Sequence, residues 1–452
     1  MKFKGLNGKA SFAHGVHPPD VKDLSKKAAI EVLPAPAQVK LPLQQNIGGP
    51  CHPIVKPRQE VAFGQMVGDG QTFVSASIHA SVAGKVQRPA MVTLPNGRHM
   101  KSIVIKSNSD QPHGRDLWQD LVSDEWPKGP FSNLDPDEIN ILIYEAGIVG
   151  LGGAAFPTHV KIIPNDKKPV DTLLINGCEC EPCLTADYRM MVEAPHPIIA
   201  GALLAARAVN ARNIIIGVED NKMDAVAALK EAAKDTPVKV AVLKTKYPQG
   251  SEKQLIYAIT RRRVPLGGLP SDVSVAMSNV GTIAAVAMAV LEDIPLTHRV
   301  VTVTGNGVVQ PKNLWVPLGT SFGELVKFCG GLKPDAVRMI AGGPMMGFAF
   351  TDMDAPVTKG TSGLTVLTEK DITSTEETQC VRCGRCVDVC PMHLVPTRLA
   401  LASRYGDVDL ARRYNISACF ECGCCAYICP ANLPLVQLIR SGKALLTARA
   451  KA

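Results

Sequence analysis

Between residues 172 and 291 the chain alternates short apolar runs with longer stretches in which apolar side chains recur every three or four positions. The short runs, rich in Val and Ile, predict buried strands, and the longer spacing predicts helices. Strands are expected at 172–176, 213–218 and 238–243, and helices at 197–209, at 222–234 and after Thr282. Strands that alternate with helices predict βαβ units, and therefore an α/β domain with a parallel sheet.

Two other regions show strand patterns with few helices. From Val39 to about Ser107, short apolar runs are interrupted by glycine, which predicts a small all-β domain. Its segment 79–86, HASVAGKV, resembles in shape the barrel-sandwich modules that carry biotin or lipoate. Lys85 lacks the neighbours of a modified lysine, so we expect it to stay unmodified. From His298 to about Phe350 strands surround a helix at 321–329, an order that suggests a β-grasp module.

These patterns predict a multidomain α/β protein. The length of 452 residues agrees with this, because it is too great for one ordinary hydrophobic core. The expected order is an extended N-terminal arm at 1–40, a barrel-sandwich-like β domain at 41–130, an α/β domain at 131–297, a β-grasp module at 298–370, an α-helical ferredoxin-like domain at 371–440 and a basic tail at 441–452.

Two near-copies of one cysteine motif stand 39 positions apart near the end of the chain, each with the spacing CxxCxxCxxxCP. The first contains Cys380, Cys383, Cys386 and Cys390, and the second contains Cys419, Cys422, Cys425 and Cys429. Three thiolates at this spacing can hold three corners of an iron–sulfur cubane. In two-cluster ferredoxins the fourth cysteine of each motif ligates the other cluster, so we predict two [4Fe-4S] clusters with interleaved ligands.

The interleaving assigns Cys429 to the cluster of the first motif and Cys390 to the cluster of the second. The competing interpretations are disulfides, which need an oxidising compartment, and zinc, which uses paired CxxC units without a third cysteine. Cys424 is an additional cysteine. The repeat offset aligns it with Arg385, so we interpret Cys424 as a non-ligand beside the cluster.

A glycine-rich segment follows a predicted helix that begins at Asp135: Gly150-Leu-Gly152-Gly153-Ala-Ala-Phe156-Pro157, with Lys161 after it. A dinucleotide-binding fingerprint needs a strand before the glycines and a helix after them, so that interpretation is disfavoured. Glycines that let backbone N–H groups approach an anion, closed by a lysine, are also suited to hold a phosphate. The alternative is an ordinary helix cap and loop.

Polar residues follow the first strand of the α/β domain, where ligands usually bind in such sheets. Asn176 ends the predicted strand, and Glu179 and Glu181 follow it within the run GCECEPC. The three cysteines of this run, at 178, 180 and 183, could bind a metal, but packed thiols are the favoured interpretation. His14 and His17 in the arm raise the same question, and a packed or solvated arm is favoured there.

Charge and composition narrow the classes of partner. A net charge of +8 and a pI near 8.8 suit nucleic acid, an anionic membrane or acidic proteins. Aromatic residues make up only 5% and no nucleic-acid-reading motif occurs, so nucleic acid is not expected. The basic start lacks the apolar run of a secretory signal. No stretch of the sequence is long and apolar enough to span a bilayer. Because iron–sulfur clusters are labile, the reducing cytoplasm is the expected compartment.

Two cubane clusters exchange one electron at a time, which indicates an electron-transfer protein. The cluster segment alone would suffice for a ferredoxin, so the residues before it are expected to supply a partner site, another cofactor or both. A nicotinamide gives two electrons as hydride, so clusters and NAD(H) on one chain require a flavin between them.

The order GLGGAAFPTHVK, INGCECEP, YPQGSE, SNVGT, β-grasp module and cysteines resembles the NADH-oxidising flavin subunit of respiratory complex I. With the N-terminal β domain and the doubled cysteine motif, the chain resembles the RnfC subunit of the Rnf complex over residues 10 to 440. The resemblance implies an FMN/NADH domain at 131–297. The residues that it places at the FMN phosphate and ring edge are Gly150, Gly152, Gly153 and Lys161, and those that would line the flavin are Asn176, Glu179, Asn279 and Thr282. The residues that would face the dinucleotide are Phe156, Glu181 and Glu252, with Gly250 in the same site.

The resemblance also has departures. The complex I relatives have an aspartate where this chain has Cys178, a glutamate where it has Ser251 and an asparagine where it has Ser278. No side chain is expected to act as an acid or base. An ordinary complex I subunit would have one four-cysteine motif, not two.

The resemblance implies an ion-translocating ferredoxin:NAD+ oxidoreductase that uses FMN, NAD(H) and two clusters. Expected partners are a ferredoxin-like iron–sulfur subunit and integral membrane subunits of the complex, with ferredoxin reacting at the level of the complex. The expected location is peripheral, on the cytoplasmic face of the bacterial inner membrane. The alternatives are a soluble flavin subunit of a hydrogenase or formate dehydrogenase, and a non-enzymatic electron-transfer scaffold.

Overall fold

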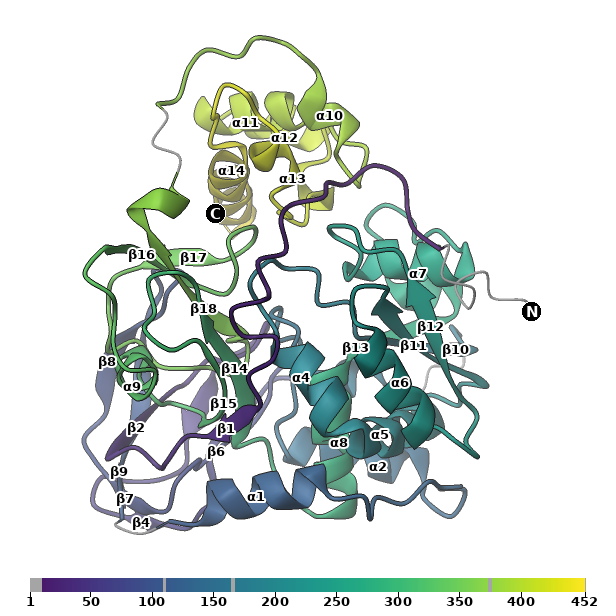
Figure 1. Ribbon diagram of the computed structural model, residues 1–452, viewed down its shortest axis with the longest axis vertical. Helices are drawn as coiled ribbons and strands as arrows, with labels where there is room; N and C mark the ends of the chain where they lie inside the picture. The colour runs from purple at the N-terminus through teal and green to yellow at the C-terminus, as the bar shows by residue number, and fades with distance from the viewer. Residues whose placement is uncertain (1–9, 109–110, 164–166, 373–375, 452) are drawn as a thin grey trace.

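The computed structural model describes residues 10–108, 111–163, 167–372 and 376–451. Expectations for residues 1–9, including the basic start, lie outside this range. Figure 1 shows an α/β body beside β-rich layers, with a small helical domain above both. Within the described residues, no helix is long and apolar enough to cross a membrane.

A four-stranded parallel sheet forms the centre of the α/β domain, in the order β12-β11-β10-β13. The strands are β10 (Thr172–Asn176), β11 (Asn213–Glu219), β12 (Val238–Leu243) and β13 (Val275–Asn279). The helices are α2 (Pro136–Glu145), α3 (Thr158–Lys161), α4 (Ala186–Glu193), α5 (Pro195–Ala208), α6 (Met223–Ala232), α7 (Glu252–Thr260) and α8 (Val280–Leu291), with the 3-10 helix η2 (Pro270–Val273) before β13.

The period-two pattern of the strands sends alternate side chains to two apolar layers. Leu173 and Ile175 pack in the layer that contains α5 and α8, whereas Leu174 packs with α7 on the other face. Gly201 lets α5 approach α8, because a Cβ at that position would lie 1.9 Å from the carbonyl oxygen of Ile283. The sheet is therefore covered on both faces, as a parallel sheet requires.

The N-terminal β domain contains a five-stranded sheet and a three-stranded sheet. Their strands are β2 (Gln38–Pro42), β4 (Glu60–Val61), β7 (Gly84–Val86), β8 (Ala90–Thr93) and β9 (His99–Ser107) in the first, and β3 (Cys51–Pro53), β5 (Met66–Gly70) and β6 (Ile78–His79) in the second. Helix α1 (His113–Val122), which the strand pattern did not predict, follows them.

The β-grasp module has a mixed sheet that recruits a strand from the N-terminal arm. The sheet contains β14 (His298–Thr304), β15 (Lys312–Pro317), β16 (Ala336–Ala341), β17 (Phe348–Phe350) and β18 (Gly363–Thr368), with α9 (Phe322–Phe328) and the 3-10 helix η3 (Glu369–Asp371). Strand β1 (Ile30–Val32) pairs in parallel with β15, so the arm is partly ordered as sheet. Figure 1 shows the arm, in purple, passing the helical domain on its way to β1.

The C-terminal domain is helical, as predicted. Its elements are α10 (Arg385–Asp388), α11 (Pro396–Arg404), α12 (Val408–Arg413), η4 (Ile416–Ala418), α13 (Cys424–Tyr427) and α14 (Leu435–Lys451). The expected basic tail continues α14 up to Lys451. Gly442 lets α14 pack against α11, because a Cβ there would lie 2.0 Å from Ser403 Oγ.

Candidate functional site

Two asparagines end neighbouring strands at the point where the strand order of the parallel sheet reverses. Asn176 ends β10 and is the register partner of Asn279, which ends β13. Strands β11 and β12 extend the sheet from one side of β10, and β13 lies on the other side. Ligands of open α/β sheets bind at such a switch point, beyond the carboxyl ends of the strands.

The glycine loop lies against this switch point. A Cβ added at Gly152 would meet the Asn279 side chain at 3.5 Å, and the backbone N–H of Leu151 donates to Thr282 Oγ1 over 2.8 Å. The Gly150 N–H donates to the carbonyl oxygen of Phe156 over 2.8 Å and closes the loop. Helix α2 precedes the loop and the short α3 follows it, so it is not a dinucleotide-binding fingerprint.

The tip of the loop has the features of an anion cradle. Gly153 has a φ of +105° and open space around its missing Cβ. Among the residues that the structure describes, the backbone N–H groups of Gly152, Gly153 and Ala154 have no hydrogen-bond acceptor. Exposed N–H donors next to a glycine in this conformation suit a phosphate, so the loop fits the expected FMN.

The two charged residues predicted near the loop form an ion pair at its edge. Lys161 Nζ lies 2.9 Å from Glu252 Oε2, and both side chains are about one-third exposed. Asn176 Nδ2 donates to the carbonyl oxygen of Gly250 over 2.9 Å. A Cβ at Gly250 would lie 2.2 Å from the carbonyl oxygen of Cys178, so this close approach requires glycine. The structure thus brings four predicted residues to one edge.

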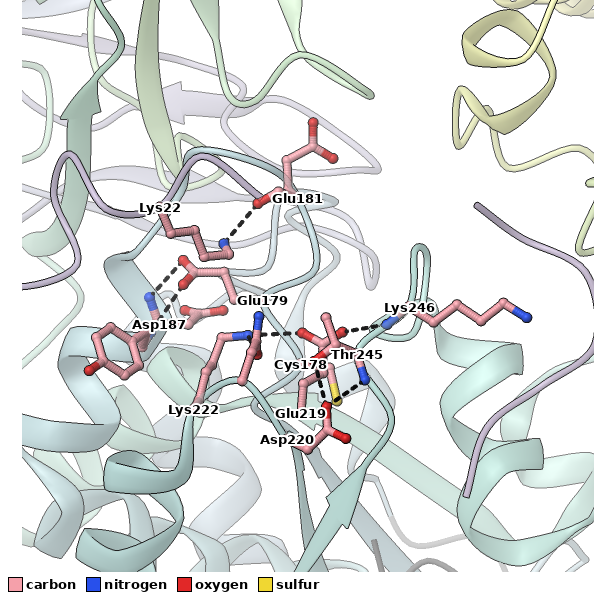
Figure 2. A network of polar contacts seen from close by, with 12 residues as sticks. Lys22, Cys178, Glu179, Glu181, Asp187, Glu219, Asp220, Lys222, Thr245 and Lys246 are labelled. Atoms are coloured by element: carbon pink, nitrogen blue, oxygen red, sulfur yellow. Dashed lines mark hydrogen bonds and ion pairs between the residues drawn. The ribbon is translucent and has the colours of Figure 1, made fainter. Parts of the chain in front are cut away.

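Glu179 is buried and caps the start of α4. Its carboxylate accepts hydrogen bonds from the backbone N–H groups of Asp187 at 3.0 Å and Tyr188 at 3.2 Å. Asp187 in turn accepts from Asn279 Nδ2 at 2.6 Å. Burial, followed by the charge of Glu179, raises the pKa of Asp187 to about 7. Figure 2 shows these acids together. Sequence reasoning missed Asp187, although an acid in the first turn of a helix was a usable signal.

Glu181 points away from the other acids, toward the β-grasp module (Figure 2). Its carboxylate accepts from the N–H groups of Met345 at 2.7 Å and Met346 at 3.1 Å, and Oε2 lies 3.3 Å from the Tyr247 hydroxyl oxygen. Burial raises the pKa of this carboxyl group above its usual value. Both backbone donors belong to the β-grasp module, so Glu181 links the α/β domain to the loop at 343–346.

Two buried lysines enter the carboxyl edge of the sheet without having been predicted. Lys22, from the arm, donates to the carbonyl oxygens of Glu181 at 2.9 Å and Leu184. Lys222 pairs with Glu219 at 2.9 Å, with both side chains 1% exposed. Figure 2 places both lysines around Glu179. They offset part of the negative charge that the acids bring into the interior.

Four cysteines from both motifs line one cavity of about 190 Å³ in the helical domain. Its lining includes Cys380, Cys383, Cys386 and Cys429, which is the set that the interleaved pattern groups together. Gly384, in the left-handed conformation with a φ of +79°, turns the first motif around this space. The cavity and its four thiols fit a cubane cluster.

The remaining motif cysteines gather on the side that faces the α/β domain. The Cys390 thiol lies within electrostatic range of Cys419, Cys422 and Cys425. Burial raises the pKa of Cys419 to about 11, so its thiolate form needs a cation nearby, which iron would provide. Gly423, with a φ of +84°, repeats the turn of Gly384. This donor set also fits a cluster.

Cys424 is fully buried beside the second set, and its thiol lies close enough to Cys422 to lower the pKa of that thiol. In the described ranges, no group of three or more His, Cys, Asp or Glu side chains is arranged to share a single metal ion. Thiolates around a cubane each bind a different iron and so surround a volume.

In the α/β domain, the Cys178 thiol donates to the carbonyl oxygen of Gly217 at 3.4 Å.

Four protein-family models match successive parts of the chain. The RnfC barrel sandwich hybrid domain matches residues 10–110, the Nuo51 FMN-binding domain 143–288, the SLBB domain 300–349 and the 4Fe-4S dicluster domain 372–430. This order confirms the predicted fold class, including the barrel-sandwich start and the relation to the complex I flavin subunit.

Curated proteins are similar over most of the chain. The C subunit of the proton-translocating ferredoxin:NAD(+) oxidoreductase complex of Clostridium ljungdahlii is 44% identical over 393 residues, covering 86% of this chain and 84% of that protein. The C subunit of the Na(+)-translocating complex of Acetobacterium woodii is 42% identical, with 86% of each chain covered. The C subunit of the ion-translocating oxidoreductase complex of Rhodobacter capsulatus is 39% identical, covering 97% of this chain and 84% of that protein.

Among solved structures, the chain is similar to an NAD+-reducing [NiFe]-hydrogenase in the H2-reduced state. The TM-score is 0.49 and the sequence identity 20%, and the match covers 74% of this chain and 64% of that one.

Proposed function

Since this chain belongs to the RnfC family, the C subunits of the ion-translocating ferredoxin:NAD(+) oxidoreductase complexes, we propose that it is the subunit through which such a complex exchanges electrons with NAD(H). The observation that carries the proposal is the combination, in one chain, of a glycine loop at the switch point of a parallel sheet and eight cysteines in two interleaved sets. Neither feature alone would join two-electron to one-electron chemistry.

FMN, when bound, supplies the conversion between the hydride chemistry of NAD(H) and single-electron transfer, and each [4Fe-4S] cluster accepts and releases one electron. The residues proposed to hold FMN are Gly150, Gly152, Gly153, Lys161, Asn176, Glu179, Gly250, Asn279 and Thr282. Support comes from the N–H groups at the loop tip, from the Asn176–Asn279 pair and from the lack of space for a side chain at Gly250.

Phe156, Glu181 and Glu252 are the residues proposed on the side of the dinucleotide. Phe156 is partly exposed on the glycine loop, and Glu252 begins α7 beside Lys161. The carboxylate of Glu181 is bonded to the backbone at 345 and 346, so its contribution would be to fix the wall of the site. We propose that no side chain donates or removes a proton in the reaction, and that these residues bind and orient.

The proposed cluster ligands are Cys380, Cys383, Cys386 and Cys429 in one set, and Cys390, Cys419, Cys422 and Cys425 in the other. The second set adjoins the α/β domain. The Tyr247 hydroxyl donates to the carbonyl oxygen of Cys422 at 2.7 Å, and Gln254 Nε2 donates to that of Pro391 at 3.0 Å. These contacts support the second set as the one nearer the flavin.

The first set is the one that a protein partner can reach. Cys380 and Cys383 are exposed, and Val381 between them is 66% exposed. Arg382, between the two cysteines, and Arg385, two positions after Cys383, are exposed as well. We propose that this rim receives the ferredoxin-like iron–sulfur subunit of the complex, with acidic side chains opposite the arginines. Integral membrane subunits would then hold the assembly at the cytoplasmic face of the inner membrane.

Membrane vesicles that contain the complex test this proposal. Vesicles without this subunit should lose ferredoxin-dependent NAD+ reduction, and addition of the anaerobically reconstituted chain should restore it. An undiminished rate without the subunit would contradict the proposal. A chain that oxidises NADH with a soluble acceptor but does not bind the vesicles would favour a soluble hydrogenase or formate dehydrogenase subunit. A chain with clusters but no NADH oxidation would favour a scaffold.

A further inference from the structure

Lys359 is a lysine of the β-grasp module with only 1% of its surface exposed. Its ammonium group donates to two backbone carbonyl oxygens, that of Ser77 at 2.5 Å and that of Gly147 at 2.6 Å. No carboxylate lies within ion-pair distance of it in the described part of the chain. Burial lowers the pKa of Lys359 to about 8, which leaves it mostly protonated at neutral pH.

The contacts of Lys359 join three domains. Ser77 belongs to the N-terminal β domain, and Gly147 leads from α2 into the glycine loop. A Cβ at Gly147 would lie 2.2 Å from the Ser77 carbonyl oxygen, so the loop approaches the β domain as closely as its backbone allows. Burying an ammonium group without a carboxylate is costly, and packing alone would be better served by an apolar side chain.

The same segment also supports the far part of the loop. The carbonyl oxygen of Lys359 accepts from the Arg299 guanidinium, which donates through Nη2 to the carbonyl oxygen of Leu151 at 3.2 Å. The next residue, Gly360, lies against the loop tip, because a Cβ there would meet the Gly153 carbonyl oxygen at 3.2 Å. The Ala155 carbonyl oxygen accepts from the Ile47 N–H at 3.0 Å.

Donors from two other domains therefore bind the carbonyl oxygens of Gly147, Leu151 and Ala155. The N–H groups of Gly152, Gly153 and Ala154 are left without acceptors in the described structure. Because the carbonyl groups of the loop are bound by the neighbouring domains, the loop cannot rotate, and its free N–H groups stay oriented toward the proposed anion site. Pre-organised donors bind more tightly than donors that must be ordered on binding.

We propose that Lys359, acting with Arg299, is a positioning residue that holds the glycine loop in its FMN-binding conformation. The proposal rests on the proposed function, because it assigns FMN to that loop. Lys359 does not touch the ligand. Its role is to connect the β-grasp and N-terminal domains to the flavin site.

The test compares FMN affinity in anaerobically reconstituted full-length variants, well below each unfolding temperature. Lys359→Met keeps the length of the side chain and removes its donors. The expected result is a rise in the Kd for FMN of about tenfold or more, with unchanged iron content and with NADH oxidation restored by excess FMN. Leu325→Ala, a fully buried change in α9 of the same module, is the control and should lower the unfolding temperature without changing the Kd.

Gly360→Ala tests the same support if Lys359→Met does not fold. The added methyl group presses on Gly153 while Lys359 stays in place, and the Kd for FMN should again rise. An unchanged Kd in a folded Lys359→Met protein, or in Gly360→Ala where the lysine variant does not fold, would overturn the proposal and leave the FMN site standing. A wild-type chain that takes up no FMN would overturn the proposed function itself.

Discussion

The hydroxyl of Tyr247 donates a 2.7 Å hydrogen bond to the carbonyl oxygen of Cys422, joining the α/β domain to the turn of the second cysteine motif. The same hydroxyl lies 3.3 Å from Glu181 Oε2. Glu181 holds Met345, and a Cβ at Gly423 would lie 2.6 Å from the carbonyl oxygen of Met345. Tyr247 and Glu181 therefore help to fix how the cluster domain sits on the proposed flavin site, together with the Gln254–Pro391 contact.

Tyr247→Phe should weaken this junction by about 1 kcal/mol, because the buried carbonyl oxygen of Cys422 loses its donor. NADH should still bleach the flavin at the wild-type rate, while electron transfer onward to a one-electron dye should slow. Stopped-flow absorbance separates the two steps. Tyr257→Phe, a half-buried tyrosine on α7 whose ring lies against the Arg261 guanidinium, is the matched control. Equal slowing of both steps would mean that Tyr247 acts on the flavin site instead.

Cys424→Ala should leave the iron content at about eight atoms per chain, because the repeat assigns Cys424 no iron. It should lower the reduction potential of the neighbouring cluster, since a polar thiol beside a ligand sulfur stabilises the more negative reduced state. Iron analysis and a potential titration followed by electron paramagnetic resonance measure both quantities. Cys425→Ser is the comparison and should lose iron. Iron loss in the Cys424 variant alone would reverse the ligand assignment.

Lys161→Met should raise the Kd for FMN about tenfold or more, because a phosphate loses its cationic partner. The same change should alter the free energy of unfolding by less than about 1 kcal/mol, because an ion pair that is one-third exposed is screened by solvent. Flavin fluorescence titration and chemical denaturation provide the two values. Lys168→Met, which removes a different surface ion pair, should change neither by much. Similar FMN affinities in both variants would remove Lys161 from the site.

Two buried histidines should destabilise the folded state as the pH falls below 6.5. Burial lowers the pKa of His298 and that of His79 to about 3, whereas an unfolded histidine has a pKa near 6.5. Between these values the unfolded state binds more protons, so each histidine costs up to about 1.4 kcal/mol of stability per pH unit as the pH falls.

Trp315 stacks on His298 with ring centroids 5.6 Å apart, so tryptophan fluorescence can follow unfolding near this histidine. Asp187, whose pKa is raised to about 7, acts in the opposite direction, so the effect of one histidine is measured as a difference between two proteins in the midpoint of urea unfolding. His298→Gln should show a shallower decline than the wild-type protein. Equal changes of the midpoint between pH 7 and pH 5 in the two proteins would contradict the assignment.

The strands of the α/β sheet were predictable because each is a short apolar run bounded by turn residues. β10 and β12 occupy the predicted ranges without change. The interleaved grouping of the cysteines stays a prediction, and the set of Cys380, Cys383, Cys386 and Cys429 lines one cavity, as that grouping requires. The strand pattern is local and the cysteine motif is repeated, so both can be recognised in the sequence without knowing how the chain packs.

The residues that sequence reasoning missed act over long separations. Lys359 bonds to Ser77, 282 positions away, and Lys22 bonds to Glu181, 159 positions away. Both donate to backbone carbonyl groups, which leave no partner residue type to search for in the sequence. Strand β1 was not predicted for a related reason. Its three residues form a strand only because they pair with β15, which is far away in the sequence.

An absorbance-monitored NADH titration of the anaerobically reconstituted chain with FMN tests the central claim most directly. We expect uptake of about one FMN per chain and bleaching by NADH of both the flavin band and the broad cluster absorbance, without another protein. A chain that assembles both clusters, binds no flavin and shows no bleaching on addition of NADH would contradict it.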